Sequence, residues 1–285
     1  MDYVQPSQVA VSMVEAGTTK ADTDVVRTVV RSVLAGAILA CATTLAFTAS
    51  DQTGVGLAGT LVFPVGFVLI VLLGLELVTG SFALVPLAVL EKRCTVRRMF
   101  AVFGWAIAGH LIGCLVYAGL YALAATKMGT DFGGSVVRMI VRASEAKTIA
   151  YKNMGVDGLL LVFIKAVLCN WLVTLGAVVA MVSSSAIGKI AAMWLPIMMF
   201  FGQGFEHAVV NLFVIPAGMM LGAKVGLFDW WIWNQIPVFL GNFIGGALGT
   251  GLLFYAAQKR LNWFDRFATS VSGRAEERKR EARVL

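Results

Sequence analysis

Long apolar runs dominate the sequence, and they lack the strict alternation of apolar and polar residues that is typical of strands. Several runs exceed the roughly 18 residues that indicate a membrane-spanning helix. The pattern predicts six transmembrane helices, near residues 29–49, 57–77, 100–125, 157–181, 188–204 and 235–257. Two shorter apolar pieces, 81–90 and 208–221, each follow a span and are too short to cross a bilayer alone. The sequence therefore predicts an all-α membrane protein.

The two halves of this pattern are alike. In each half of three spans, a polar break and a short apolar piece follow the middle span. The breaks are residues 74–80, GLELVTG, and residues 202–207, GQGFEH. Two sets of three helices must cross the membrane in opposite directions, so the pattern predicts an inverted 3+3 repeat with two interrupted helices. Paired interruptions at matching places point to a transport site near the bilayer midplane.

Composition supports a membrane location. Hydrophobic residues make up 59% of the 285 residues, charged residues make up 14%, and the mean hydropathy is +0.83. Soluble domains average about 25% charged residues. A chain with so little charge cannot cover a globular surface, so much of its surface must face lipid.

Basic residues predict the orientation. The net charge is +7, and Lys and Arg concentrate before the first span, in the loop at 92–98 and in the C-terminal tail. Because cytoplasmic segments carry an excess of Lys and Arg, we expect a multi-pass inner (plasma) membrane protein with both termini in the cytoplasm. Residues 1–28 form a cytoplasmic segment without the apolar core of a signal peptide. A transport domain, 29–257, and a basic cytoplasmic tail, 258–285, follow.

Other classes of function lack their signatures. The four cysteines form no CxxC pair, and no cluster of carboxylates, histidines and cysteines has metal-ligand spacing. No nucleotide-binding loop is present, and the basic segments are typical of cytoplasmic faces rather than of nucleic-acid binding. We therefore expect a protein that is not an enzyme and that needs no metal or other cofactor.

The breaks carry ionisable groups at membrane depth, which is costly and therefore usually functional. For Glu76 and Glu206 we favour a supporting role, in which each carboxylate caps free amide groups at a broken helix end. His207 lies in the second break, and its imidazole can carry or lend a proton. The other histidine, His110, lies beside Gly109 with no polar break after it, so we expect it to be a hydrogen-bonded packing residue.

Several motifs together resemble those of the formate/nitrite transporter family. The stretch 200–216, FFGQGFEHAVVNLFVIP, resembles the second-break motif of that family, and 168–173, LCNWLV, resembles its helix 4 motif. The first break at 76–80 resembles the corresponding family motif. Residues 234–237, NQIP, and 241–246, GNFIGG, resemble the beginning of its sixth helix. The resemblance runs through residues 30–257.

This resemblance implies an aquaporin-like fold, assembled as a homopentamer with one pore in each protomer. It implies passage of small monovalent anions of weak acids together with a proton, with formate as the leading substrate and nitrite second. Lactate, acetate and hydrosulfide stay open. Carried across to this chain, His207 matches the central pore histidine and Thr79 the threonine that faces it. Asn170 matches the helix 4 asparagine near that histidine.

The resemblance also assigns constrictions and a charged outer mouth. Three phenylalanines are expected to form apolar constrictions above and below the histidine: Phe63, Phe67 and Phe200. A lysine of the outer loop is expected to attract anions, and Lys147 is the better local match while Lys152 competes with it. Lys165 is expected to snorkel or to pair at a subunit contact.

These assignments predict a mechanism. A bare anion between phenylalanine constrictions would lose its hydration at a high cost, so the anion takes a proton and crosses as the neutral acid. A competing class is a neutral-solute channel of the aquaporin type, which needs two Asn-Pro-Ala helix caps, and neither break contains one.

Overall fold

The computed structural model describes residues 2–258, and this part of the chain is helical apart from turns and one isolated backbone bridge between Tyr3 and Ser183. The basic tail predicted at 258–285 lies outside the described residues except for Gln258.

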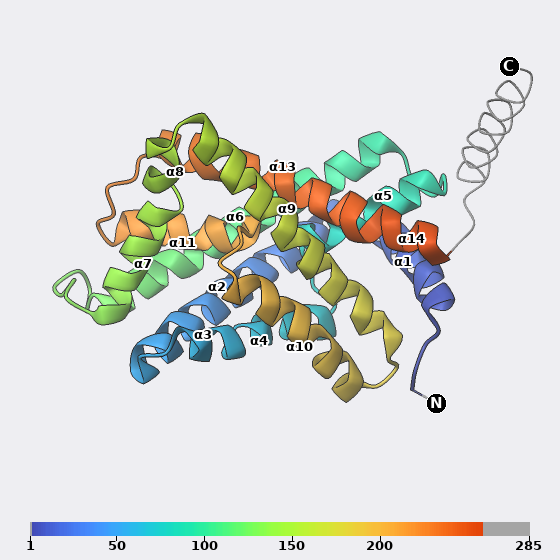
Figure 1. The fold of residues 1–285 in the computed structure, drawn as a ribbon, viewed down its shortest axis with the longest axis horizontal. Coiled ribbons are helices and arrows are strands. Elements are labelled where there is room, and N and C mark those ends of the chain that lie inside the picture. Colours follow the sequence, from blue (N-terminus) through green and yellow to red (C-terminus); the bar gives the residue numbers. More distant parts are fainter. Residues whose placement is uncertain (1, 259–285) are drawn as a thin grey trace, which may run out of the picture.

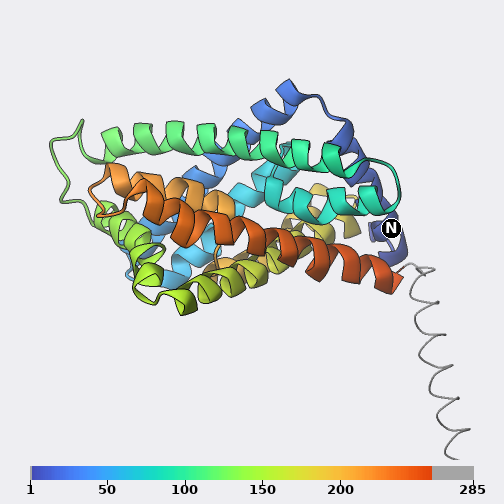
Figure 2. The ribbon, with the colours of Figure 1, turned by 90° about the horizontal axis from the view of Figure 1, so that it is seen from above.

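Within this part, four helical segments are long and apolar enough to cross a membrane. They are α2 (Val25–Thr53), α6 (Val96–Ala125), α9 (Val156–Val179) with the 3-10 turn after it, and the final segment Leu227–Gln258. The final segment stays near the long axis of the molecule, whereas α2 and α9 cross that axis obliquely (Figures 1 and 2). The final segment consists of α12 (Leu227–Trp230), the π-helical η2 (Trp231–Gln235), α13 (Ile236–Ile244), the π-helical η3 (Gly245–Leu252) and α14 (Leu253–Gln258).

The other two predicted spans are broken, as the polar breaks indicated. The first consists of α3 (Gly56–Val62) and α4 (Pro64–Leu72), followed after the break by α5 (Val78–Leu90). The second consists of α10 (Ala186–Gly202) and, after the break, α11 (Ala208–Met220). The predicted ends of these spans, at 77 and 204, were too late.

Two glycines explain those early ends. Gly74 and Gly204 adopt φ values of 62° and 63° directly after the helices end. Positive φ is readily available only to glycine, and it stops the preceding helix. In each break the following amide donates back to the helix: Leu75 N–H to Ile70 O at 2.9 Å, and Phe205 N–H to Phe200 O at 3.2 Å.

Three helices were not predicted. One is α1 (Pro6–Asp22), in the segment expected only to be cytoplasmic, and the others are α7 (Ser135–Ala146) and α8 (Ile149–Asn153), between α6 and α9. The buried side of α1 includes Val9 and Met13, which pack with Leu84 of α5 and Tyr255 of α14. This contact places the N-terminal helix and the end of α14 at the same end of the molecule (Figure 1).

Glycines bring two helix pairs into backbone contact. If Gly113 of α6 carried a β-carbon, that atom would lie 2.0 Å from Val33 O of α2. If Gly245 of η3 carried one, it would lie 2.1 Å from Val167 O of α9. Gly245 belongs to a run of glycines at every fourth position, 241, 245 and 249, and such a run can serve a contact between subunits or within one protomer. Gly241 and Gly249 also face α9 of the same chain, so this run of glycines makes a contact within the protomer.

Candidate functional site

The two breaks meet at a buried contact between Thr79 and His207. Thr79 is the second residue of α5 and His207 is the N-cap of α11, and Thr79 Oγ1 lies 3.1 Å from His207 Nε2. The Val210 N–H donates to His207 Nδ1 at 3.2 Å. Because a backbone amide can only donate, Nδ1 must be the acceptor nitrogen, and a neutral ring then carries its proton on Nε2. His207 therefore donates to Thr79, and the Thr79 hydroxyl proton stays available for another acceptor.

Asn170 of α9 joins this contact from the side. Its Nδ2 donates to Thr79 O at 3.0 Å and to Asn242 O at 2.6 Å, which fixes the orientation of the carboxamide. Asn170 Oδ1 is buried and has no hydrogen-bond partner among the described residues. A buried acceptor without a partner costs about 1–3 kcal/mol, so this position suits a solute or water that donates a hydrogen bond. The structure thus brings together the three polar residues that the sequence assigned to the pathway.

An aromatic cluster lies against the imidazole on one side. The Phe200 ring is stacked on His207 with centroids 5.5 Å apart, and Phe63 meets Phe200 edge-on at 5.7 Å. Phe63 and Phe200 therefore belong to one cluster, and a constriction of the pathway by these rings stays a prediction. Phe201, which the sequence did not single out, stacks on Phe63 at 3.8 Å. Phe67 is buried one helical turn after Phe63.

A second aromatic cluster was not expected from the sequence. Phe82 of α5 lies one turn after Thr79 and meets Phe103 of α6 edge-on at 4.9 Å and Phe243 of α13 at 5.7 Å. The spacing of Phe82 from Thr79 on a short helix was the only signal for it, and such spacing is equally common in ordinary packing.

Glu206 is buried in a network of side chains. It accepts hydrogen bonds from Tyr151 Oη at 2.8 Å and from Asn211 Nδ2 at 2.8 Å, and it pairs with Lys147 Nζ at 2.8 Å. Burial, and then the Glu206 carboxylate, raise the pKa of Tyr151, so its phenol stays protonated as the donor. Asn234 adds a further hydrogen bond to Glu206 at 3.3 Å.

Glu76 occupies the matching place in the first break. It pairs with Lys20 Nζ of α1 at 2.7 Å and accepts a hydrogen bond from Ser81. The sequence did not identify Lys20, because the contact depends on the unpredicted helix α1. Both glutamate carboxylates thus accept hydrogen bonds from side chains. We had expected them to accept hydrogen bonds from the amides at the helix ends.

Those amides have other acceptors. The Ala208 N–H donates to Asn242 Oδ1 at 2.9 Å, and the Val78 N–H donates to His110 Nε2 at 3.1 Å. His110 is fully buried, and its Nδ1 donates to Ser32 O of α2 at 2.9 Å. His110 is thus a buried, hydrogen-bonded histidine, and its two ring nitrogens join separate elements, α5 and α2.

The three lysines singled out from the sequence, Lys147, Lys152 and Lys165, each lie near another side chain. Lys147 pairs with Glu206 and its side chain is mostly buried, whereas Lys152 pairs with Asp229 Oδ1 at 2.8 Å and its side chain is about half exposed. Lys165 Nζ lies 5.9 Å from the centroid of the Tyr151 ring. The attraction of anions by Lys147 or Lys152 stays a prediction, with the added fact that each has a carboxylate partner.

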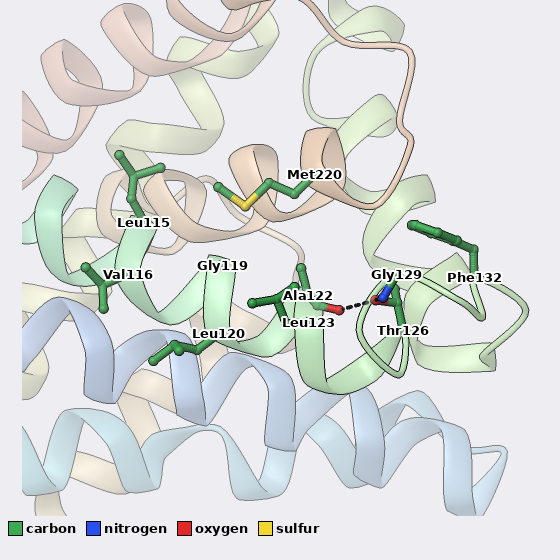
Figure 3. A pocket seen from close by; sticks show the side chains of 10 residues that line it. All are labelled: Leu115, Val116, Gly119, Leu120, Ala122, Leu123, Thr126, Gly129, Phe132 and Met220. Carbon is green, nitrogen blue, oxygen red and sulfur yellow. Dashed lines mark hydrogen bonds between the residues drawn. The ribbon is translucent and has the colours of Figure 1, made fainter.

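An apolar cavity of about 530 Å³ lies away from this site, along the end of α6 beside Met220 (Figure 3). Thr126 is its main polar side chain, and the Thr126 hydroxyl already donates to Ala122 O and accepts from the Gly129 N–H. The cavity offers an anion no free donor from that hydroxyl, so we assign no part of the pathway to it.

The sequence matches the model of the formate/nitrite transporter family over residues 7–256. The chain belongs to the formate/nitrite transporter family. It is 33% identical over 270 residues to a Bacillus subtilis protein named "Uncharacterized transporter YrhG", a match that covers 90% of this chain and 94% of the relative. It is 30% identical over 269 residues to the formate channel BtFdhC of Bacillus thuringiensis, a match that covers 91% and 98%.

The fold of this family member also matches a solved structure. That structure is described as a pentameric formate channel with formate bound, and it aligns with a TM-score of 0.65 at 24% identity over 82% of this chain and 97% of the other. The likeness shows that the helical fold is that of the family. The chain is thus an integral membrane protein of a transporter family.

Proposed function

We propose that this protein is a channel for small monovalent weak-acid anions, with formate as its main substrate, and that a proton crosses with the anion. Transport runs in either direction along the combined gradient and needs neither ATP nor sodium. The observation that carries this proposal is the buried junction of the two breaks, where Thr79, His207 and Asn170 offer hydrogen-bonding groups among phenylalanine rings.

The junction suits a neutral carboxylic acid. Such an acid has one O–H donor and one carbonyl acceptor. Asn170 Oδ1 has no partner among the described residues and can accept from the acid O–H. The Thr79 hydroxyl, which accepts from His207, can donate to the acid carbonyl. Passage of the bare anion beside the Phe200 ring would remove hydration that partial charges at helix ends replace only in part, which favours the protonated form.

We further propose that the membrane domain, 29–257, is an inverted 3+3 repeat of six spans with an aquaporin-like arrangement. Two sets of matching features support it. The half-helices α5 and α11 both have 13 residues and follow breaks with a glycine at positive φ. They lie toward opposite ends of the molecule (Figure 1).

The assembly and orientation follow from the same proposal. A homopentamer is supported by the likeness to a structure described as pentameric. Cytoplasmic termini in the inner (plasma) membrane are supported by the basic residues near α1 and by the shared position of α1 and the end of α14. The segment 1–28 then packs on the cytoplasmic end through α1.

A substrate panel in proteoliposomes tests the function. Formate, nitrite, acetate, lactate and hydrosulfide are offered at imposed pH gradients, with glycerol and water permeation as the comparison for a neutral-solute channel. Formate uptake that rises with an inward proton gradient is expected. Equal formate uptake in vesicles with and without correctly inserted protein would refute the proposal, and selective glycerol permeation would replace it with the neutral-solute class.

A further inference from the structure

Two short motifs repeat in the halves of the chain. Residues 109–113 read GHLIG on α6, and residues 241–245 read GNFIG on α13 and the first residue of η3. The motifs differ at the polar position, where one has histidine and the other asparagine. The repetition suggests that His110 and Asn242 perform comparable tasks.

The glycines of the two motifs make matching close approaches. A β-carbon at Gly109 would lie 2.7 Å from Val29 O on α2, and one at Gly241 would lie 2.7 Å from Phe163 O on α9. The second glycine of each motif contacts the same partner helix one turn further along. Each motif therefore fixes its helix against a partner at backbone distance, and the polar residue between the glycines is held in a defined place.

From that place, each polar residue caps a half-helix. Asn242 Oδ1 accepts from the first amide of α11, and His110 Nε2 accepts from the first amide of α5. Each also donates to a carbonyl of its partner helix: Asn242 Nδ2 to Ala166 O at 2.8 Å, and His110 Nδ1 to Ser32 O at 2.9 Å. The imidazole of His110 thus makes the same two kinds of hydrogen bond as the carboxamide of Asn242: it accepts one from a helix-end amide and donates one to a carbonyl.

The two residues differ in one respect. Asn242 Nδ2 has a second hydrogen, which it donates to Glu206 O at 2.9 Å. A neutral imidazole has one N–H, and His110 uses it on Ser32 O. An asparagine at position 110 could therefore perform the whole task of His110, whereas a histidine at position 242 would lose one of three hydrogen bonds.

We infer that His110 is a positioning residue for transport: its neutral imidazole caps the first residue of α5 and thereby holds Thr79 against His207. Val78, whose amide His110 binds, directly precedes Thr79. His110 thus connects α2, α6 and the start of α5 at the point where the two breaks meet. The effect of His110 on transport rests on the proposed function, whereas the hydrogen bonds of the His110 ring do not.

The bonding can be tested by solid-state NMR. The chain has two histidines, so protein labelled with 15N-histidine and purified on a tag without histidine gives two imidazoles. The contacts require opposite neutral tautomers, with the proton on Nδ1 of His110 and on Nε2 of His207. The variant His110→Asn removes one set of signals and so assigns the other. A neutral His110 that carries its proton on Nε2 would overturn the inference, whether or not the protein transports formate.

The role in transport can be tested with three variants. We expect His110→Leu to lower initial formate uptake per inserted protein about tenfold, which corresponds to the free-energy cost of losing one helix cap. We expect His110→Asn to keep uptake within about twofold of the parent. Asn242→His should lower uptake, because its second donor is lost. Size-exclusion profiles show which variants are folded. If His110→Leu transports like the parent, or if His110→Asn fails as His110→Leu does, the positioning role is wrong. If the parent itself moves no formate, the proposed function fails, and the tautomer result alone decides the role of His110.

Discussion

Removing the charge of Lys147 should destabilise the protein far more than removing the charge of Lys152. Both lysines lie between α6 and α9, and both pair with a carboxylate at 2.8 Å. The side chains of Lys147 and Glu206 are 20% and 2% exposed, whereas those of Lys152 and Asp229 are 47% and 15% exposed. The variant Lys147→Gln leaves the Glu206 carboxylate buried without its cation.

The expected magnitudes differ clearly. Loss of one partner of a buried pair costs about 3–5 kcal/mol, and we expect about 3 kcal/mol because Tyr151 and Asn211 still donate to Glu206. Loss of an exposed pair costs about 0.2–1 kcal/mol. At about 2 °C per kcal/mol for a chain of this size, Lys147→Gln should lower the Tm by roughly 6 °C and Lys152→Gln by no more than about 2 °C.

The assay is thermal unfolding in lipid nanodiscs, followed by tryptophan fluorescence at one fixed scan rate because unfolding of such proteins is often irreversible. Lys152→Gln is the matched control. The double variant Lys147→Gln, Glu206→Gln leaves no unpaired charge and should recover most of the lost Tm. Equal shifts for the two single lysine variants, or a double variant whose shift is the sum of its single variants, would refute this reasoning.

Three further outcomes are expected. His207→Phe should abolish formate uptake because it removes the hydrogen-bonding group and adds apolar bulk. His207→Asn should keep some uptake, with an altered pH profile. If His207→Phe takes up formate as the parent does, His207 is a packing residue. Gly245→Val should reduce the yield of folded protein much more than Gly249→Ala. An added β-carbon would lie 2.1 Å from Val167 O of α9 at position 245, but 3.0 Å from the Trp171 ring at position 249. Size-exclusion chromatography measures the yield, and equal yields would contradict the close packing. The double variant Lys147→Gln, Lys152→Gln should lower initial formate uptake several-fold at low salt and by less at high salt. The reason is that salt screens surface charge within about 8 Å at physiological ionic strength. Unchanged uptake at low salt would exclude an electrostatic role for these lysines.

The sequence predicted the helical membrane class and the places of the two breaks, because apolar length and glycine are local signals. It placed the ends of α4 and α10 too late, since Leu75 and Phe205 are apolar although they follow the glycines that stop the helices. It missed α1 because a helix that lies against other helices needs only one apolar side and no long apolar run.

The candidate site was predicted in part. Thr79, His207 and Asn170 come together as the family motifs implied. Lys20 could not be assigned as a partner of Glu76, because that contact joins residues 56 positions apart through a helix that the hydropathy pattern did not show. The contact of His110 with the start of α5 could have been inferred from the sequence, because the motif around it recurs at 241–245 with a polar residue in the same position.

The contact between Thr79 and His207 also joins the beginnings of two helices, α5 and α11. The N-terminus of a helix carries the equivalent of about half a positive charge from its aligned peptide dipoles. Two such ends therefore face one another at the centre of the protein. Backbone dipoles placed in this way raise the energy of a sodium or hydronium ion at the junction and lower that of an anion, before any side chain contributes. A proton can then pass this point more easily as part of a neutral acid than as a free cation.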